Sequence, residues 1–201
     1  MVVRNVSFLA LTGLLAVGAA AQIRSSAPLA LQPESRIWVE GTSTVRSFTC
    51  RAPTVNVAVA TSSADAVAAT LAGQKVVNTV RLEVPARSMD CDNGTMNGHM
   101  FTALKANEHP SIVFRMTSYD LQARDGSSAA VRLQGRLDLG GQERPITMNA
   151  EARQGPNGAL RVVGAQEVKL SDHGLRAPTL MMGTMRVGDV VRVNYDLLLR
   201  P

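Results

Sequence analysis

Sulfur and imidazole side chains are the first candidates for chemistry in this sequence. His99 lies between Met96 and Met100, and the stretch RAPTLMMGTMRVGD at 176–189 concentrates further methionines. The methionines of that stretch are Met181, Met182 and Met185. Thioether and imidazole groups can bind copper(I), but methionine also fills cores and lines sites for apolar ligands. A copper-handling protein and an adaptable apolar wall are therefore two open hypotheses.

The residue types of a hydrolytic triad occur side by side in Ser171-Asp172-His173. Adjacent residues cannot all face one another, and a triad is defined by its geometry in space. The tetrapeptide with Gly174 is instead typical of a turn, with Asp172 as a cap and Gly174 at a positive φ. The sequence has no H-E-x-x-H, G-x-S-x-G, Walker or G-x-G-x-x-G motif. We therefore predict no catalytic residues, no metal site and no cofactor.

The N-terminal residues have the pattern of a secretory signal peptide. Arg4 provides a positive charge, an apolar run covers 6–21, and the run ends in three alanines. This run is shorter than the ~20 residues that a membrane-spanning helix needs. We expect cleavage after Ala21 and a mature chain that is periplasmic or secreted.

Two cysteines, Cys50 and Cys91, lie in the exported part of the chain. An even number of cysteines in an exported protein favours a disulfide. Their spacing does not suit a redox motif or a zinc site. We predict a structural Cys50–Cys91 bridge.

The charge of the chain is moderately basic. The formal charge is +5, and the sequence pI is about 9.9. An anionic partner such as a membrane surface in transient contact would suit this charge, but the Lys and Arg residues are scattered and aromatics are scarce. We expect solvated basic strand faces and no nucleic-acid binding; the oligomeric state is left open.

Alternation of apolar and polar residues dominates the rest of the chain. In the C-terminal segment the residues of one apolar face are Val191, Val193, Tyr195, Leu197 and Leu199. This period is typical of antiparallel strands with one buried face. Further strands are predicted at 36–40, 45–50, 54–61, 76–84 and 112–119, and turns near Gly126, Gly140 and Gly155 separate four consecutive runs. Eight or nine such strands must close into a barrel or stack as a sandwich.

Three segments interrupt the strand pattern. Residues 22–35 contain prolines and serines without a period, and we interpret them as a linker before a domain at 36–200. Residues 65–71 could form one or two helical turns. Apolar residues at helical spacing predict a helix within 95–107, which Pro110 must end. Such a helix would cover a sheet edge or cap the mouth of a barrel.

Four segments resemble the YceI-like family of exported bacterial lipid- or polyisoprenoid-binding proteins. They are GTSTVRSFTC at 41–50, MNGHMFTALKANEHPSIVFRMTSY at 96–119, GRLDLGGQERPITMNAEA at 135–152, and the closing VKLSDHGLRAPTLMMGTMRVGDVVRVNYDLLL at 168–199. They follow the order of the family and cover nearly the whole mature chain. The resemblance implies an all-β fold with one or two short helices: an extended antiparallel eight-stranded lipocalin-like barrel. It also implies a binding protein of the periplasm, without enzymatic activity, that holds a long isoprenoid chain of a quinone or polyprenyl lipid.

Physical reasoning on the side chains agrees with an apolar interior. An eight-stranded barrel can hold one small ligand, and small aliphatic side chains leave room for a hydrocarbon guest. The predicted lining residues are Trp38, Phe48, Phe101, Leu104, Phe114, Leu137, Met148, Met181 and Tyr195. The open hypotheses are a carrier of an amphiphilic lipid, a Met/His copper-handling protein, and a solidly packed structural barrel.

Overall fold

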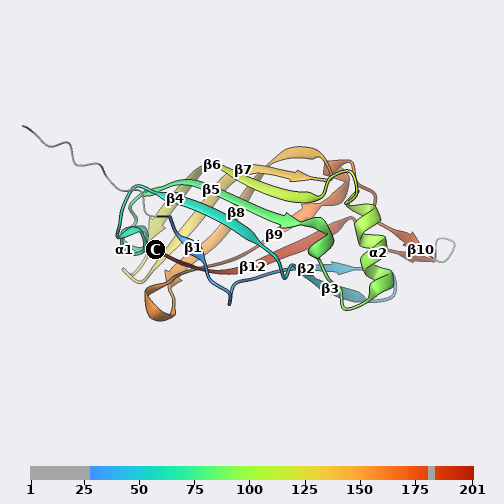
Figure 1. The fold of residues 1–201 in the computed structure, drawn as a ribbon, viewed down its shortest axis with the longest axis horizontal. Coiled ribbons are helices and arrows are strands. Elements are labelled where there is room, and N and C mark those ends of the chain that lie inside the picture. The colour runs from blue at the N-terminus through green and yellow to red at the C-terminus, as the bar shows by residue number, and fades with distance from the viewer. Residues whose placement is uncertain (1–27, 181–183) are drawn as a thin grey trace, which may run out of the picture.

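The computed structural model describes residues 28–180 and 184–201. The predicted signal peptide and Met181 lie outside these residues. A single sheet of ten strands forms the body of the molecule (Figure 1). Its strands are β1 (Ala30–Leu31), β2 (Arg36–Thr42), β3 (Ser47–Arg51), β4 (Asn56–Thr61), β5 (Val77–Pro85), β6 (Ser111–Ala123), β7 (Ser128–Leu139), β8 (Gln142–Gln154), β9 (Leu160–Lys169) and β12 (Val190–Arg200). A separate hairpin consists of β10 (Thr179–Leu180) and β11 (Met185–Arg186).

The sheet is antiparallel and curls so that its two edges approach each other. The strand order is β3-β2-β12-β9-β8-β7-β6-β5-β4, with β1 added on β12. Near one end Leu29, just before β1, forms a bridge to Val59 of β4. Near the other end Arg51 of β3 forms a bridge to Asp90, which follows β5. The predicted all-β, antiparallel, lipocalin-like architecture is confirmed.

The sheet has ten strands, where the resemblance implied eight. The periodicity predicted nine of them, and the tenth, β1, lies inside the predicted linker. Leu29 is only 2% exposed and belongs to the core, so the folded domain starts before Arg36. A two-residue strand is too short to show a period of two, which is why the sequence pattern suggested a linker.

Within the described residues, two α-helices lie at opposite ends of the curled sheet (Figure 1). Helix α1 (Ala66–Leu71) and helix α2 (Gly94–Ala103) occupy the two predicted helical segments. The Asn93 side chain caps α2 by accepting a hydrogen bond from the Met96 amide. Three short 3₁₀ helices, η1 (Ala86–Ser88), η2 (Pro156–Gly158) and η3 (Leu170–His173), complete the elements. No helix in the described part of the chain is long and apolar enough to cross a membrane.

Helix η3 covers a place where the sheet ladder is interrupted. β8 pairs with β9 only from Ala150 onwards. Pro145, which has no N–H to donate, lies in the part of β8 that pairs with β7 but not with β9. There the Arg144 Nε donates to the carbonyl of Asp172, and His173 Nδ1 lies 2.9 Å from the carbonyl oxygen of Gln142. The turn therefore replaces ladder contacts along this stretch of β8.

The predicted turn geometry at 171–174 is half right. Gly174 has a φ of +64°, as expected. The capping carboxylate, however, is that of Asp189, which accepts hydrogen bonds from the Ser171 amide and hydroxyl. These hydrogen bonds lower the pKa of Asp189. Asp189 lies 18 residues after Ser171 in the sequence. The pairing of β12 with β9, which starts at Val190 and Lys169, brings it to the turn.

Candidate functional site

A cavity of about 650 Å³ runs inside the curled sheet from the α1 end to the α2 end. Its volume lies within the ~300–1,000 Å³ of ordinary ligand pockets. Along β12 its lining extends from Val191 to Leu199. At ~3.3 Å per residue and a strand tilt of ~35–45°, this corresponds to about 19–22 Å along the barrel axis. The cavity is therefore long and narrow.

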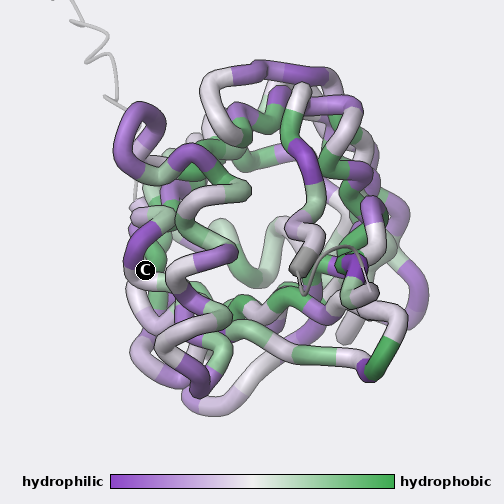
Figure 2. Tube along the Cα trace, turned by 90° about the vertical axis from the view of Figure 1, so that its right-hand side faces the viewer, coloured by the Kyte–Doolittle hydropathy of each residue, from purple (hydrophilic) through white to green (hydrophobic). Residues whose placement is uncertain are grey.

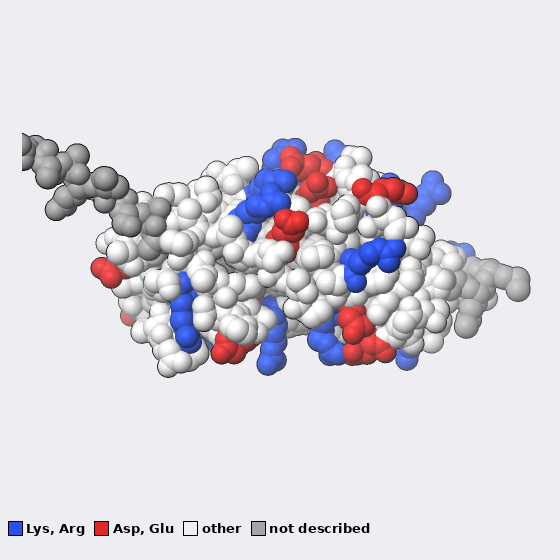
Figure 3. Space-filling model, in the orientation of Figure 1, with Lys and Arg blue, Asp and Glu red and all other residues white. Residues whose placement is uncertain are grey.

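The wall of this cavity is almost entirely apolar. Valine, leucine, isoleucine and methionine side chains of successive strands provide most of it, and none of the described lining residues is acidic. Figure 2 looks along the long axis from the α2 end, and the strands form a ring around this interior. On the face that Figure 3 shows, charged side chains are scattered in small mixed groups. The alternation in the sequence thus separates a hydrocarbon-like interior from a wet exterior.

Glycines keep three aromatic rings against the cavity wall. Phe48 lies against Gly41 of the neighbouring strand, Phe114 against Gly135, and the Tyr195 hydroxyl against Gly164, so that a Cβ at any of these glycines would overlap the ring or hydroxyl. Gly41 and Phe48 are direct cross-strand partners, as are Gly164 and Tyr195. Because the glycines have no side chain, the rings can lie along the wall and leave the centre free.

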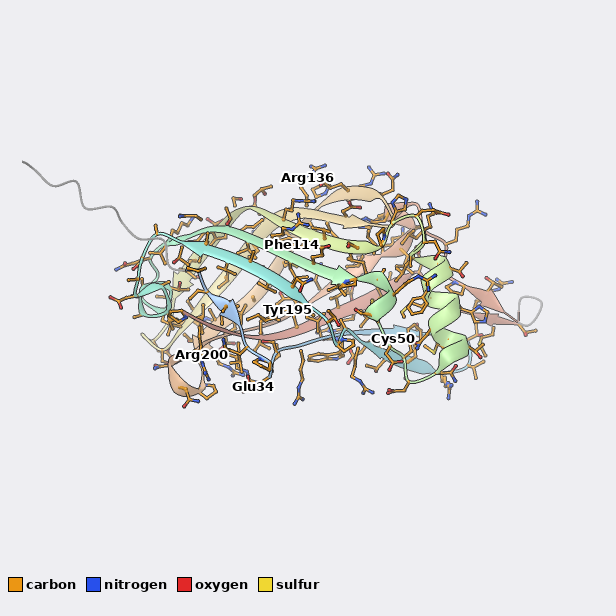
Figure 4. The ribbon with its side chains drawn as sticks, viewed as in Figure 1. Glu34, Cys50, Phe114, Arg136, Tyr195 and Arg200 are labelled. Atoms are coloured by element: carbon orange, nitrogen blue, oxygen red, sulfur yellow. A yellow bond between two sulfur atoms is a disulfide. The ribbon has the colours of Figure 1, made fainter. Side chains whose placement is uncertain are left out.

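A hydrogen bond from β12 to β8, across the intervening strand β9, fixes the ring of Tyr195. Its hydroxyl donates to the Asn149 carbonyl of β8 at 3.0 Å, where β8 has lost its pairing with β9. The residue is only 7% exposed. Burial raises the pKa of Tyr195 to about 12. The phenol is therefore neutral at physiological pH and acts as a structural donor (Figure 4 labels Tyr195 and Phe114 in the middle of the barrel).

The α2 end carries most of the polar lining. Helix α2 contributes Met96, His99 and Met100, the β2–β3 turn contributes Ser43 and Arg46, and the β10–β11 hairpin contributes Met185. The Cys50–Cys91 disulfide, predicted from the sequence and present in the structure, joins β3 to the segment before α2. Figure 4 shows Cys50 beside α2. These elements together form the rim of the cavity.

Six of the nine residues predicted to line the interior do contact the cavity. They are Phe48, Leu104, Phe114, Leu137, Met148 and Tyr195. Their contact with a ligand stays a prediction. Met181 lies outside the described residues, and its neighbour in the cluster, Met185, lines the cavity.

Trp38 and Phe101 point away from the cavity. Ile37 and Val39 of β2 face inward, so Trp38 faces outward, where its indole N–H donates to Glu40. Phe101 is five residues after Met96, which places it about 140° around the helix from the lining face. Its ring contacts the Arg87 guanidinium, with 5.5 Å between the Arg87 Cζ and the ring centroid. Both residues were predicted to line the interior. Strand alternation places Trp38 outside the barrel, and helix rotation turns Phe101 away from the cavity.

Among the described residues, His173 and Ser171 of the triad-like sequence are both engaged in structural hydrogen bonds. His173 is 5% exposed and bound to the Gln142 carbonyl, while Ser171 donates its hydroxyl proton to Asp189. Within residues 28–180 and 184–201, no group of three or more His, Cys, Asp and Glu side chains is placed to hold a metal ion. Met100 Sδ lies 3.7 Å from Cys91 Sγ, which is already in the disulfide. Arg46 is the rim residue that the sequence prediction missed, because a single arginine in a turn has no pattern around it.

Comparison with known proteins places this geometry in a family. Residues 34–199 match the YceI-like domain. The chain belongs to the YceI-like family. This confirms the resemblance of the four sequence segments. No curated protein matches the chain in sequence.

Solved structures share the fold of this YceI-like domain at low sequence identity. BcnA of Burkholderia cenocepacia has a TM-score of 0.62 and 13% identity, over 82% of this chain and 96% of that one. A polyisoprenoid-binding domain of Saccharophagus degradans has a TM-score of 0.60 and 13% identity, over 88% and 99%. A YceI protein of Campylobacter jejuni has a TM-score of 0.55 and 17% identity, over 76% and 84%. These similarities establish the fold of the YceI-like domain.

Proposed function

We propose that this protein is an exported, non-enzymatic carrier that holds one long-chain amphiphilic lipid, of the polyisoprenoid or quinone type, in its barrel. The observation that carries the proposal is the continuous apolar cavity between α1 and α2. Burial of each CH₂ stabilises a complex by ~0.8 kcal/mol, so a long chain needs few polar contacts. The similar fold of a polyisoprenoid-binding domain supports the same ligand class.

The length of the cavity favours a long chain. One leaflet of a bilayer provides about 15 Å of hydrocarbon, half of its ~30 Å core. The lining of about 19–22 Å along the barrel axis is longer than this. A polyprenyl tail therefore matches the cavity better than a short acyl chain does.

Export is part of the proposal. The signal-like N-terminus and the Cys50–Cys91 disulfide both support an oxidising compartment such as the periplasm. Contact with a membrane surface would be transient, during exchange of the lipid.

The decisive experiment is mass spectrometry of an organic extract of the protein purified from its native host. The carrier hypothesis predicts one stoichiometric class of long-chain lipid. A clean extract, together with no uptake of added prenol by the purified protein, would contradict it. The open interior already argues against the solidly packed barrel.

A copper(I) titration distinguishes the copper-handling hypothesis from the lipid-carrier hypothesis. Wild type and a variant with Met181, Met182 and Met185 replaced by leucine should take up copper(I) equally. A stoichiometric copper(I) site that disappears in the variant would favour the metal hypothesis instead.

A further inference from the structure

The ionisable groups of the cavity are distributed unevenly. Besides two phenols, the charged or titratable side chains among the described lining residues are Arg46 and His99. Both belong to elements of the α2 end, and the described lining contains no Asp or Glu. Among the described lining residues, the guanidinium and the imidazole therefore both lie at one end of the cavity.

The turn that carries Arg46 is held firmly. The Ser43 hydroxyl accepts hydrogen bonds from the amides of Val45 and Arg46 and donates to the Arg46 carbonyl. Thr44 donates its amide to Arg186 and its hydroxyl to the Thr184 carbonyl. The backbone of Arg46 is thus tied to Ser43, and Thr44 ties the same turn to the segment of β11.

His99 is held on the inner face of α2. It lies three residues after Met96 and one before Met100, and all three line the cavity. Phe48, which leads from the Arg46 turn into β3, packs in the same apolar cluster as Met96 and Met100. The disulfide fixes β3 to the segment before the helix. Figure 1 shows the β2–β3 turn beside α2 at this end.

The neighbouring carboxylates already have partners. Asp92 forms an ion pair with Arg51, and Asp90 accepts hydrogen bonds from the Asn97 side chain and the Asp92 amide, which lower the pKa of Asp90. Neither Arg46 nor His99 has a side-chain partner among the described residues. A guanidinium and an imidazole N–H at the rim are therefore available to a ligand.

We propose that the α2 end binds the anionic headgroup of the lipid, a phosphate or a carboxylate, through Arg46 and His99. This inference rests on the proposed lipid-carrier function and adds the headgroup and its direction. The planar guanidinium suits bidentate binding of either anion, and the imidazole donates a further hydrogen bond. Arg46 is exposed, so the headgroup stays at the water-facing rim while the chain extends toward α1. The wall at the α1 end offers no charged group among the described residues.

The test compares matched lipids on the delipidated protein. The neutral fluorophore N-phenyl-1-naphthylamine reports occupancy of the apolar cavity, and farnesyl phosphate and farnesol compete with it. We expect farnesyl phosphate to displace the fluorophore at a concentration at least about tenfold lower than farnesol does. Oleate and oleyl alcohol form a second pair, which tells whether the site takes a carboxylate as well as a phosphate.

Variants assign the preference to the rim. The double variant Arg46→Gln/His99→Gln should bind farnesol as wild type does and lose the preference for the phosphate. Arg132→Gln, at an exposed position on β7 that does not line the cavity, is the matched control and should keep the preference.

Failure of this inference differs from failure of the proposed function. Equal binding of charged and neutral lipids by wild type, or an unchanged preference in the double variant, would overturn the headgroup site and leave the carrier function intact. If the fluorophore and all four lipids fail to bind, the carrier function itself is overturned, and the headgroup site with it.

Discussion

Single residues decide whether the barrel interior is open or filled. Phe48, Phe114 and Tyr195 would block a narrow cavity if their rings pointed to its axis. Each ring instead lies on a glycine of the wall, at Gly41, Gly135 and Gly164. Because each ring packs on a glycine, it lies along the wall and leaves the interior open to a ligand.

Gly164→Ala tests this pairing. The new Cβ would overlap the Tyr195 hydroxyl and the Asn149 carbonyl oxygen, and the carbonyl belongs to the backbone and cannot easily move. We expect a loss of about 1–3 kcal/mol in the free energy of unfolding, measured by urea denaturation. Gly98→Ala is the control, because nothing lies within 4 Å of its Cβ and alanine favours the α2 helix. Equal stability of the two variants would contradict the proposed role of Gly164.

Tyr195→Phe tests the buried phenol. At neutral pH the variant should lose about 1–2 kcal/mol, because the Asn149 carbonyl is left without its donor. The raised pKa, from 10.0 to about 12, also makes wild type sensitive to alkali. Between these values the unfolded chain has released the proton and the folded chain still holds it, so stability falls as the pH rises.

The measurement is urea unfolding of both proteins from pH 9 to pH 11.5. Wild type should lose stability over this range by about 2 kcal/mol more than Tyr195→Phe does. Parallel pH profiles of the two proteins would show that burial does not raise the pKa of Tyr195 as described.

At the scale of elements, α2 is the cover of one end of the cavity and is held mainly from its N-terminal side. None of its residues is fully buried. The disulfide connects its preceding segment to β3, and the Asn97 side chain accepts a hydrogen bond from the Cys91 amide. The rest of the helix packs through Met96, Met100 and the following Leu104.

Replacing both Cys50 and Cys91 by alanine should therefore loosen this end selectively. Opening the loop between residues 41 positions apart is expected to cost about 2–4 kcal/mol. Hydrogen exchange should become faster for the amides of α2, whereas those in the paired centre of β7 and β8 should change only with global stability. Uniform acceleration across all elements would mean that the bridge does not specifically hold the helix.

At the scale of the whole molecule, the cavity joins two apolar clusters that belong to opposite ends. Leu29 and Leu71 lie in the cluster of the α1 end, and Ile37 and Met89 in a cluster toward α2. Val162 packs against both clusters and lines the cavity. A ligand that uses the full length of the barrel must pass this residue.

Val162→Trp should therefore divide the cavity. Exclusion of even two CH₂ groups at ~0.8 kcal/mol each weakens binding about tenfold, so a long prenol such as solanesol should lose at least this much affinity. A short prenol such as geraniol fits in one half and should bind as in wild type. Val163→Trp is the control. Val163 is the next residue on β9, and it pairs with Asp196 on the outer face of the sheet. Unchanged solanesol binding by Val162→Trp would contradict a ligand that extends through both halves.

The sequence by itself determined the fold class and much of the wall. Period-two alternation separates an apolar from a polar face because successive strand residues point to opposite sides. This alternation predicted nine strands and an apolar face that includes Tyr195. Helical spacing predicted the α2 segment, and the even number of cysteines predicted the disulfide. The strands and the helix follow from local periodicity. The disulfide follows from the presence of two cysteines in an exported chain.

Only the tertiary structure decided what the interior is. Trp38 and Leu104 are both apolar in sequence, but register and helix rotation place one outside and the other on the cavity. Glycines opposite the aromatic rings, and not composition, leave the interior open. Arg46 and His99 both line the α2 end of the cavity because the curl of the sheet and the disulfide bring distant segments to that end. Such contacts between residues far apart in the chain have no periodic signal, so the headgroup end could not be located before the fold was known.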